Sequence, residues 1–301
     1  MHKTQIAALA LCLASANVFA QSCGQAQGSE ETVIHEVQVL HQLPPEVPAY
    51  SVFAGEQLEF DTDFLRERMD RELIAFTYTH STSTLMLKRA GKYFPIVEPI
   101  LKEYGIPDDF KYLMVIESNL DPKALSSVGA AGLWQFTKAS AKTYGLEIRE
   151  GVDERYNIEK ETRAACKFLK QSYAKFGNWL TVAASYNAGI GGISKRASEQ
   201  HQSLAIDMWL PEETTRYIFR LHACKMMFEN PKAFGFDISE EDRYPYAQPR
   251  KRVKVNDSIP SLVDFAESHG VTYAQLKAAN LWLRDSKLDN KEKKEYEIII
   301  P

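Results

Sequence analysis

Residues 111–136 read KYLMVIESNLDPKALSSVGAAGLWQF, and this stretch joins an apolar run directly to a carboxylic acid. We predict a helix over residues 108–118. At 100° per residue, Glu117 falls on the same stripe of this helix as Phe110, Leu113 and Met114. Burial among apolar side chains raises the pKa of a carboxyl group. Glu117 is therefore a candidate general acid that stays protonated near neutral pH. The alternative is a structural glutamate that pairs with a cation or caps the backbone.

The composition and charge of the chain exclude some classes of function. The chain has 301 residues, 45% of them hydrophobic, which is enough for one large or two modest cores. Its formal net charge of −4 lacks the basic excess typical of nucleic-acid binding, so we expect no nucleic-acid partner. The sequence contains no CxxC or HExxH motif, so we expect no metal site and no cofactor.

The N-terminus has the pattern of a secretory signal peptide. His2 and Lys3 precede an apolar stretch that ends in Val-Phe-Ala at 18–20, so we predict a signal peptide over 1–20. The apolar stretch is too short to span a bilayer, and the alternative is a hydrophobic helix of the fold. We therefore expect an exported protein of the periplasm or cell envelope. Cys23 is a poor match to a lipidation site, and association with the outer membrane would follow only from its lipidation.

Helical periodicity dominates the middle of the chain. Residues 21–61 are polar and punctuated by proline, which indicates a linker or an extended arm. We assign residues 62–242 to an all-α domain without strands, 243–251 to a linker, and 252–301 to an independent strand–helix–helix–strand module. Within the α domain the helices are predicted at 63–78, 84–104, 108–118, 137–144, 159–176, 179–189 and 212–229.

The cysteines and tryptophans of the helical region are predicted to be core residues. Cys166 and Cys224 lie beside small residues in helical patterns, which is typical of buried thiols, and a disulfide between them is the alternative. Most tryptophans in helical domains belong to the core, and stacking on a sugar is the alternative for Trp134, Trp179 and Trp209.

Four short motifs occur in order along the helical region: ES at 117–118, GLWQF at 132–136, ASYNAG at 184–189 and LPEETTRYI at 210–218. Together they resemble the lytic transglycosylases of the goose-type-lysozyme superfamily, most of all the membrane-bound D-type. The resemblance covers about residues 63–230. It implies a mainly α fold, with a lysozyme-like all-α catalytic domain followed by the small α+β module.

The resemblance also implies roles for particular residues. Glu117 would be the catalytic acid and base, and Ser126 would hydrogen-bond its carboxyl group. Four further residues would line the glycan cleft or the catalytic site: Gln135, Tyr186, Asn187 and Tyr217. Gly132 and Gly189 match motif glycines, which we expect to serve close packing and backbone conformation. The Glu-Thr-Arg of the family reads Glu-Thr-Thr-Arg at 213–216 here, so the role of Arg216 stays open.

The implied reaction is cleavage of the β-1,4 bond between MurNAc and GlcNAc in peptidoglycan. Most glycosidases need a second carboxylate, and Asp121 is the obvious candidate near Glu117. However, Asp121 precedes Pro122 in a polar turn, where aspartate commonly has a structural role. A single acid suits a non-hydrolytic route. Glu117 would protonate the leaving oxygen, and the 2-acetamido group of MurNAc can stabilise the oxocarbenium-like centre. Glu117 would then take a proton from the C6 hydroxyl of the same sugar, which attacks C1 and leaves a 1,6-anhydro-MurNAc end.

Two alternatives to this reading remain. One is a lysozyme- or chitinase-like hydrolase on the same scaffold, and the other is a non-catalytic peptidoglycan-binding protein. In each case the expected partner is the glycan strand, and we expect a monomer.

Residues 252–301 resemble a LysM domain. A strand around Val253 and Val255 precedes two helical patterns at 260–268 and 273–280, and the chain closes with the strand YEIIIP. LysM modules bind the N-acetylglucosamine backbone of glycans, so the resemblance implies a glycan-binding module. The usual Gly-Asp-Thr-Leu is replaced by Asn-Asp-Ser-Ile at 256–259, and a module retained only for structure is the alternative.

Overall fold

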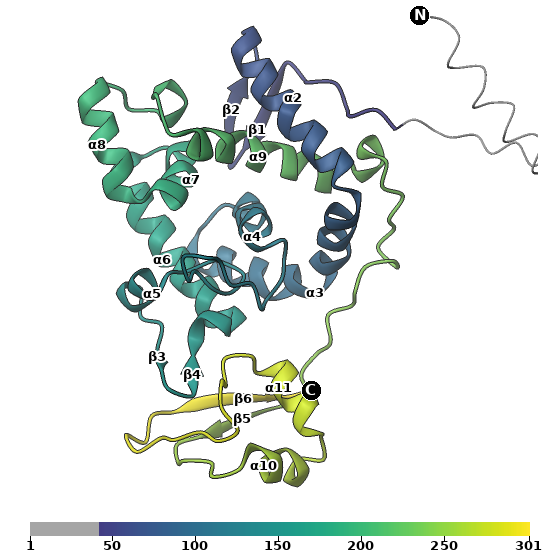
Figure 1. Ribbon diagram of the computed structural model, residues 1–301, viewed down its shortest axis with the longest axis vertical. Coiled ribbons are helices and arrows are strands. Elements are labelled where there is room, and N and C mark those ends of the chain that lie inside the picture. Colours follow the sequence, from purple (N-terminus) through teal and green to yellow (C-terminus); the bar gives the residue numbers. More distant parts are fainter. Residues whose placement is uncertain (1–41) are drawn as a thin grey trace, which may run out of the picture. The chain divides into compact units, whose positions relative to one another are not determined.

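The computed structural model describes residues 42–301. The predicted signal peptide, Cys23 and the first part of the predicted arm lie outside the described residues. The described chain is mainly helical and ends in a small domain that contains strands, as the sequence predicted (Figure 1). Across the described range, no helix is both long enough and apolar enough to cross a bilayer.

The elements follow one another along the chain as labelled in Figure 1. The α-helices are α2 (Asp63–Tyr78), α3 (His80–Tyr104), α4 (Lys111–Ser118), α5 (Lys138–Thr143), α6 (Ile158–Phe176), α7 (Trp179–Ala188), α8 (Ile190–Gln200), α9 (Glu212–Glu229), α10 (Leu262–Ser268) and α11 (Tyr273–Ala279). The strands are β1 (Tyr50–Phe53), β2 (Glu56–Glu59), β3 (Ile148–Arg149), β4 (Val152–Asp153), β5 (Lys251–Val255) and β6 (Tyr296–Ile300). The 3-10 turns are η1 (Asp108–Phe110), η2 (Glu154–Tyr156), η3 (Ala205–Asp207) and η4 (Pro231–Phe234).

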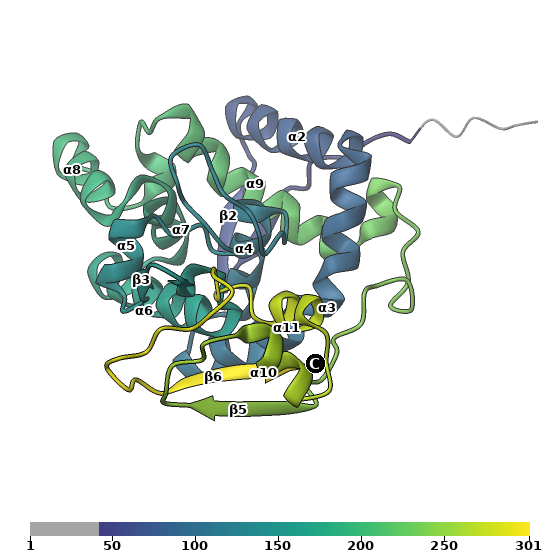
Figure 2. The same ribbon diagram turned by 60° about the horizontal axis from the view of Figure 1, so that its bottom comes forward.

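Helix α4, which carries Glu117, lies inside the helical domain, with α3, α6, α7 and α9 around it (Figures 1 and 2). Its consecutive residues Tyr112 to Val115 are all buried, so burial is not confined to one face of the helix. The predicted apolar stripe therefore does not by itself explain why α4 is buried. Packing against the surrounding helices buries residues outside that stripe as well. It ends at Asn119, which adopts a left-handed conformation (φ 51°) that asparagine tolerates well.

The predicted arm is wrong for its last residues, because β1 and β2 form an antiparallel hairpin that belongs to the helical domain. Phe53 and Phe60 are fully buried in the main core. The Glu56 carboxylate accepts hydrogen bonds from the backbone N–H groups of Trp179 (2.6 Å) and Leu180 (3.0 Å). A carboxylate at the start of a helix satisfies otherwise unpaired N–H groups and favours the helix dipole, so the hairpin holds the start of α7 in place.

Three other elements, one helix and two short strands, differ from the predictions. Helix α8 was not predicted, because Gly191 and Gly192 weaken the helical pattern. The two-residue strands β3 and β4 form a small hairpin around Gly151, so the middle of the chain is not purely helical. Each segment is too short to produce an alternating pattern in the sequence.

The C-terminal domain has the predicted strand–helix–helix–strand order. β5 pairs with β6 in antiparallel register, and Thr272 forms a capping box with Gln275 at the start of α11. The prediction that this domain is independent is wrong. Its hydrophobic cluster includes Ala131, Val152 and Tyr156 of the helical domain.

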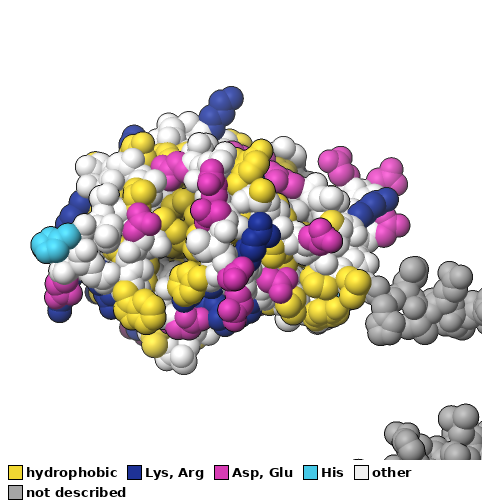
Figure 3. Space-filling view, turned by 90° about the horizontal axis from the view of Figure 1, so that it is seen from above, with side chains coloured by type: hydrophobic (Ala, Val, Ile, Leu, Met, Phe, Trp, Pro, Cys, Tyr) yellow, Lys and Arg dark blue, Asp and Glu magenta, His cyan; other side chains and the backbone are white. Residues whose placement is uncertain are grey.

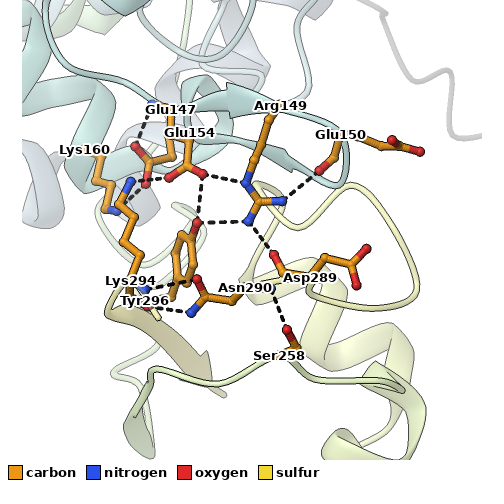
Figure 4. A network of polar contacts seen from close by, with 10 residues as sticks. All are labelled: Glu147, Arg149, Glu150, Glu154, Lys160, Ser258, Asp289, Asn290, Lys294 and Tyr296. Carbon is orange, nitrogen blue, oxygen red and sulfur yellow. Dashed lines mark hydrogen bonds and ion pairs between the residues drawn. The ribbon is translucent and has the colours of Figure 1, made fainter. Parts of the chain in front are cut away.

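Backbone and polar contacts reinforce this junction. The segment after α11 runs beside the β3–β4 hairpin, where the N–H of Asp153 donates to the carbonyl of Trp282 and the N–H of Arg284 to that of Gly151, each at 2.9 Å. Figure 4 shows the polar network at the other side of the hairpin. There Arg149 donates to the Asp289 carbonyl (2.8 Å), and the Tyr296 hydroxyl donates to Glu147 (2.8 Å). The two domains are thus joined by a shared core and by buried and exposed polar contacts.

The cysteines Cys166 and Cys224 are both buried and free, so the predicted packing role is confirmed and the alternative disulfide is wrong. On the face drawn in Figure 3, acidic and basic side chains are interspersed, with small groups of hydrophobic side chains between them. That face therefore presents no single sign of charge.

Candidate active site

Glu117 is partly buried at the C-terminal end of α4, and the hydroxyl of Tyr217 donates a 2.6 Å hydrogen bond to its Oε1. Burial raises the pKa of Glu117 to about 7. The Tyr217 hydrogen bond lowers it, the carboxylate of Glu213 raises it, and the cation of Arg220 lowers it. Because burial outweighs the favourable contacts, this carboxyl group is balanced between its acid and base forms near neutral pH.

Helix α9 supplies the three groups that act on Glu117. Glu213, Tyr217 and Arg220 are spaced i, i+4 and i+7, so they lie on one face of the helix. Sequence reasoning singled out Tyr217 but missed Arg220, which this spacing could have identified. Arg216 instead donates from Nε to Glu72 (2.7 Å) on α2, so it does not replace an arginine at the site.

Tyr217→Phe is expected to raise the pKa of Glu117 further. The tyrosine hydroxyl donates to the carboxylate, and its loss removes an interaction that favours the ionised form. In the variant, the pH above which activity falls should move upward by about one unit. The pH dependence of kcat/KM on soluble glycan strands measures this shift. An unchanged alkaline limb would show that Tyr217 does not act on the Glu117 carboxyl.

Tyr186 and Asn187 lie at the end of α7, and their side chains hydrogen-bond to different partners. The Tyr186 hydroxyl donates to the backbone carbonyl of Trp134 (2.8 Å). The Asn187 amide donates to Glu213 (3.1 Å) and accepts from the Thr214 hydroxyl (2.8 Å). These two residues therefore connect α7 to the loop after α4 and to the first turn of α9.

The loop between Asn119 and Phe136 is organised by contacts of its own. Gln135, in a left-handed conformation (φ 51°), donates from its side chain to the Gly132 carbonyl (2.9 Å). The Ser126 hydroxyl accepts the N–H of Ala130 (3.0 Å), and it makes no hydrogen bond to Glu117. In this structure both side chains shape the loop, and the expected Ser126–Glu117 contact is not formed.

A buried acid that sequence reasoning missed supports the same loop. Glu161 on α6 is fully buried, and its Oε2 accepts the backbone N–H of Trp134 (3.1 Å). Burial raises the pKa of Glu161 well above its ordinary value. Its surroundings in sequence, ETRAAC, look like an ordinary solvent-facing first turn of a helix, so no local signal reveals this role.

The motif glycines have different functions. At Gly132 (φ 85°) an added Cβ would overlap the carbonyl oxygen of Arg155 and the carboxylate of Glu161, so both conformation and close packing require glycine. At Gly189 (φ 77°), which joins α7 to α8, no atom lies within 4 Å of an added Cβ. Only the backbone conformation requires glycine there.

Gly132→Ala is expected to destabilise the protein by about 2 kcal/mol more than Gly129→Ala. Both glycines lie in the same loop with positive φ, but an added Cβ at Gly129 meets no atom within 4 Å. The comparison therefore isolates the cost of the close contact with Arg155 and Glu161. Denaturant unfolding of the two variants measures the difference, and equal losses would contradict the packing argument.

The other candidates are placed as follows. Asp121 accepts the N–H of Lys123 (2.9 Å) within its turn, in agreement with a structural role. Trp134 is fully buried, as predicted, whereas Trp209 is 79% exposed and is not a core residue. Residues 42–301 contain no group of three or more His, Cys, Asp or Glu side chains that could hold a metal ion.

The fold and the site define a mainly helical domain in which the acid Glu117 is partly buried, followed by a small αβ domain. Residues 96–209 match the model of the transglycosylase SLT domain. Residues 251–301 match the model of the soluble lytic transglycosylase C-terminal LysM-like domain. The chain thus carries an SLT domain followed by a LysM-like domain.

Individual relatives agree with this assignment. The chain is homologous to membrane-bound lytic murein transglycosylase D of Escherichia coli K12, with 27% identity over 245 residues, which cover 78% of this chain and 52% of that protein. It is 40% identical over 87 residues to peptidoglycan transglycosylase gp16 of phage T7, covering 28% of this chain and 7% of that protein. This chain therefore spans about half the length of the first of these relatives.

Among solved structures, the 70 kDa soluble lytic transglycosylase SLT70 of Escherichia coli aligns with a TM-score of 0.41 and 17% identity. The alignment covers 60% of this chain and 33% of that chain. A TM-score this low does not define the fold.

Proposed function

We propose that this chain is an exported peptidoglycan lytic transglycosylase, in which Glu117 acts first as the acid and then as the base. The domain assignments and the homology to a lytic murein transglycosylase support the reaction class. The catalytic domain of the proposal begins at the β1–β2 hairpin, not at residue 62, because the hairpin side chains belong to its core.

One observation carries the proposal: the pKa of Glu117 is raised to about 7 by burial. At neutral pH about half of this carboxyl population holds a proton. The protonated form can donate to the glycosidic oxygen as the bond breaks. The ionised form can then accept the proton of the MurNAc C6 hydroxyl, which attacks C1 to give the 1,6-anhydro end. Efficient transfer in both directions needs a pKa near the working pH, and this site has one.

Tyr217 is placed to assist both proton transfers by Glu117. Its hydroxyl donates to Oε1 of Glu117, which leaves Oε2 for the substrate. A donor on one oxygen stabilises the carboxylate that forms after the first proton transfer. Tyr217 would therefore also fix the orientation of the carboxyl group, the task that the resemblance gave to Ser126.

The alternative reaction, hydrolysis, has one observation in its favour. Glu213 is a second carboxylate close enough to act electrostatically on Glu117. It is exposed, and it accepts a hydrogen bond from Asn187. A second carboxylate beside the reacting sugar could activate a water molecule, as in many glycosidases.

Mass spectrometry of the muropeptides released from purified sacculi distinguishes these reactions. The proposal predicts 1,6-anhydro-MurNAc ends, and these should persist in the variant Glu213→Gln. Reducing ends in place of anhydro ends would show hydrolysis. If no fragments are released, the chain is a binding protein and the proposal is wrong.

For the C-terminal domain we propose a structural role beside any glycan binding. Its segment 282–284 lies along the β3–β4 hairpin, and its core includes Ala131 of the loop that follows Glu117. The domain would thus help to hold the active-site loop in place, which favours the structural alternative for this LysM-like module.

A further inference from the structure

The seam between the two domains contains a basic pocket that the proposed reaction does not use. It has a volume of about 350 Å³ and is open to solvent. One wall is Lys123, in the loop that follows Glu117, and the others come from α11 and the segment after it, including Lys277 and Arg284. The pocket therefore brings together three cations from both domains, and no acidic residue lines it.

The three cations lack the carboxylate partners that other basic residues of this protein have. Among the described residues, Lys123, Lys277 and Arg284 take part in no ion pair within 4.0 Å. The acid that acts electrostatically on Lys277 is Asp285, whose Oδ1 accepts the N–H of Ser286 (2.6 Å). Three unpaired cations around one hollow of an acidic protein favour an anionic ligand.

Two of the cations are already held in place. Lys277 donates from Nζ to the backbone carbonyls of Leu283 and Asp285, the latter at 2.8 Å. The guanidinium of Arg284 lies over the ring of Tyr156, 4.3 Å from its centroid, and donates to the carbonyl of Leu281 (3.0 Å). Neither side chain needs to be ordered when a ligand arrives, so little conformational entropy is lost on binding.

The surroundings of Lys277 also favour an anionic ligand in this pocket. Burial lowers the pKa of Lys277, and the neighbouring cation of Arg284 lowers it further. An anion placed between the two would relieve this repulsion, and a carboxylate can accept two hydrogen bonds from one guanidinium.

We propose that Lys123, Lys277 and Arg284 bind a free carboxylate of the stem peptide carried by the peptidoglycan strand. The proposal rests on the proposed function, which makes a peptidoglycan strand the ligand of the neighbouring cleft. Lys123 is six residues after Glu117 in the chain, so the pocket begins at the same loop that shapes the catalytic site. In an intact strand the lactyl carboxyl group of MurNAc forms an amide bond with the stem peptide. The free carboxylates therefore belong to the stem peptide.

The test compares binding of two strands by calorimetry in the Glu117→Gln background, where cleavage of the glycan is expected to be roughly 10³-fold slower. One strand carries intact stem-peptide carboxylates, and in the other they are converted to primary amides. Lys123→Gln with Arg284→Gln should weaken binding of the intact strand about tenfold and leave binding of the amidated strand unchanged. Lys123→Gln alone should weaken it less, and this variant removes no side-chain hydrogen bond, so it should fold normally.

A matched control separates local binding from net charge. Lys195→Gln with Lys232→Gln removes the same charge from two exposed lysines that do not line the pocket, and it should change neither affinity. Equal affinities of the pocket variant and its parent for the intact strand would overturn the proposal, as would an equal loss on both strands. Failure of the wild-type protein to cleave sacculi would overturn the proposed function instead, and the binding result would still decide this proposal.

Discussion

Glu117→Gln is expected to lower the rate of glycan cleavage by roughly 10³-fold, because an amide cannot donate and recover the proton. The substitution keeps the shape of the side chain, and glutamine can still accept the Tyr217 hydrogen bond. Release of soluble fragments from sacculi measures the rate. Glu199→Gln, a change of an exposed glutamate on α8, serves as the control and should keep full activity. Cleavage at the wild-type rate by Glu117→Gln would show that another residue is the acid.

The same variant is expected to be more stable than the wild type above about pH 4.5, and the difference in stability should reach its full size above pH 7. The pKa of Glu117 is about 7 in the folded protein, whereas its ordinary value, which applies to the unfolded chain, is 4.5. Below pH 4.5 the group is protonated in both states and the two proteins should be equally stable. Between pH 4.5 and 7 the unfolded chain ionises while the folded chain holds its proton, so wild-type stability falls as pH rises.

Above pH 7 this cost is complete and amounts to roughly 3 kcal/mol, which the glutamine variant avoids. Denaturant unfolding at pH 4 and at pH 8 measures the difference between the two proteins. A stability difference of the same size at both pH values would contradict a raised pKa for Glu117. If the variant is inactive but more stable, the buried Glu117 lowers the stability of the protein and is needed for its catalytic activity.

Arg155→Met is expected to destabilise the protein by about 3–5 kcal/mol, because it leaves the buried carboxylate of Asp153 without its partner. Arg155 is 3% exposed and pairs with Asp153 through Nη2 (2.7 Å) and Nε (3.0 Å). Its Nη1 donates to the carbonyls of Gly129 (2.7 Å) and Phe136 (3.1 Å), at the two ends of the segment that carries Gln135. The variant should therefore also lose activity at temperatures where it is still folded.

Denaturant unfolding and sacculus digestion measure the two effects of Arg155→Met. Arg163→Met is the matched control, because its ion pair with Glu103 is exposed and should contribute little. Adding Asp153→Asn to Arg155→Met should recover part of the stability, since the unpaired buried charge is then removed. If Arg155→Met were as mild as Arg163→Met, the loop would not depend on this pair.

The β3–β4 hairpin links these effects to the C-terminal domain. The hairpin ends at Asp153, whose N–H donates to Trp282 of that domain and whose carboxylate holds Arg155. A continuous set of contacts therefore runs from the C-terminal domain to the segment that carries Gln135. Nothing in residues 148–153 of the sequence indicates this link, because each partner is more than a hundred residues away or belongs to another loop.

The sequence by itself determined most of the helices, though not α8, as well as the strand–helix–helix–strand order of the C-terminal domain and the candidate acid Glu117. These predictions follow from local periodicity and from short motifs that can be recognised without knowledge of their neighbours in space. Only the tertiary structure decided that the β1–β2 hairpin belongs to the core, that Glu161 and Arg155 hold the loop after α4, and that Glu213 and Arg220 adjust the pKa of Glu117. The physical reason is that burial and electrostatic environment are properties of contacts between distant segments, and a linear pattern records only one side of each contact.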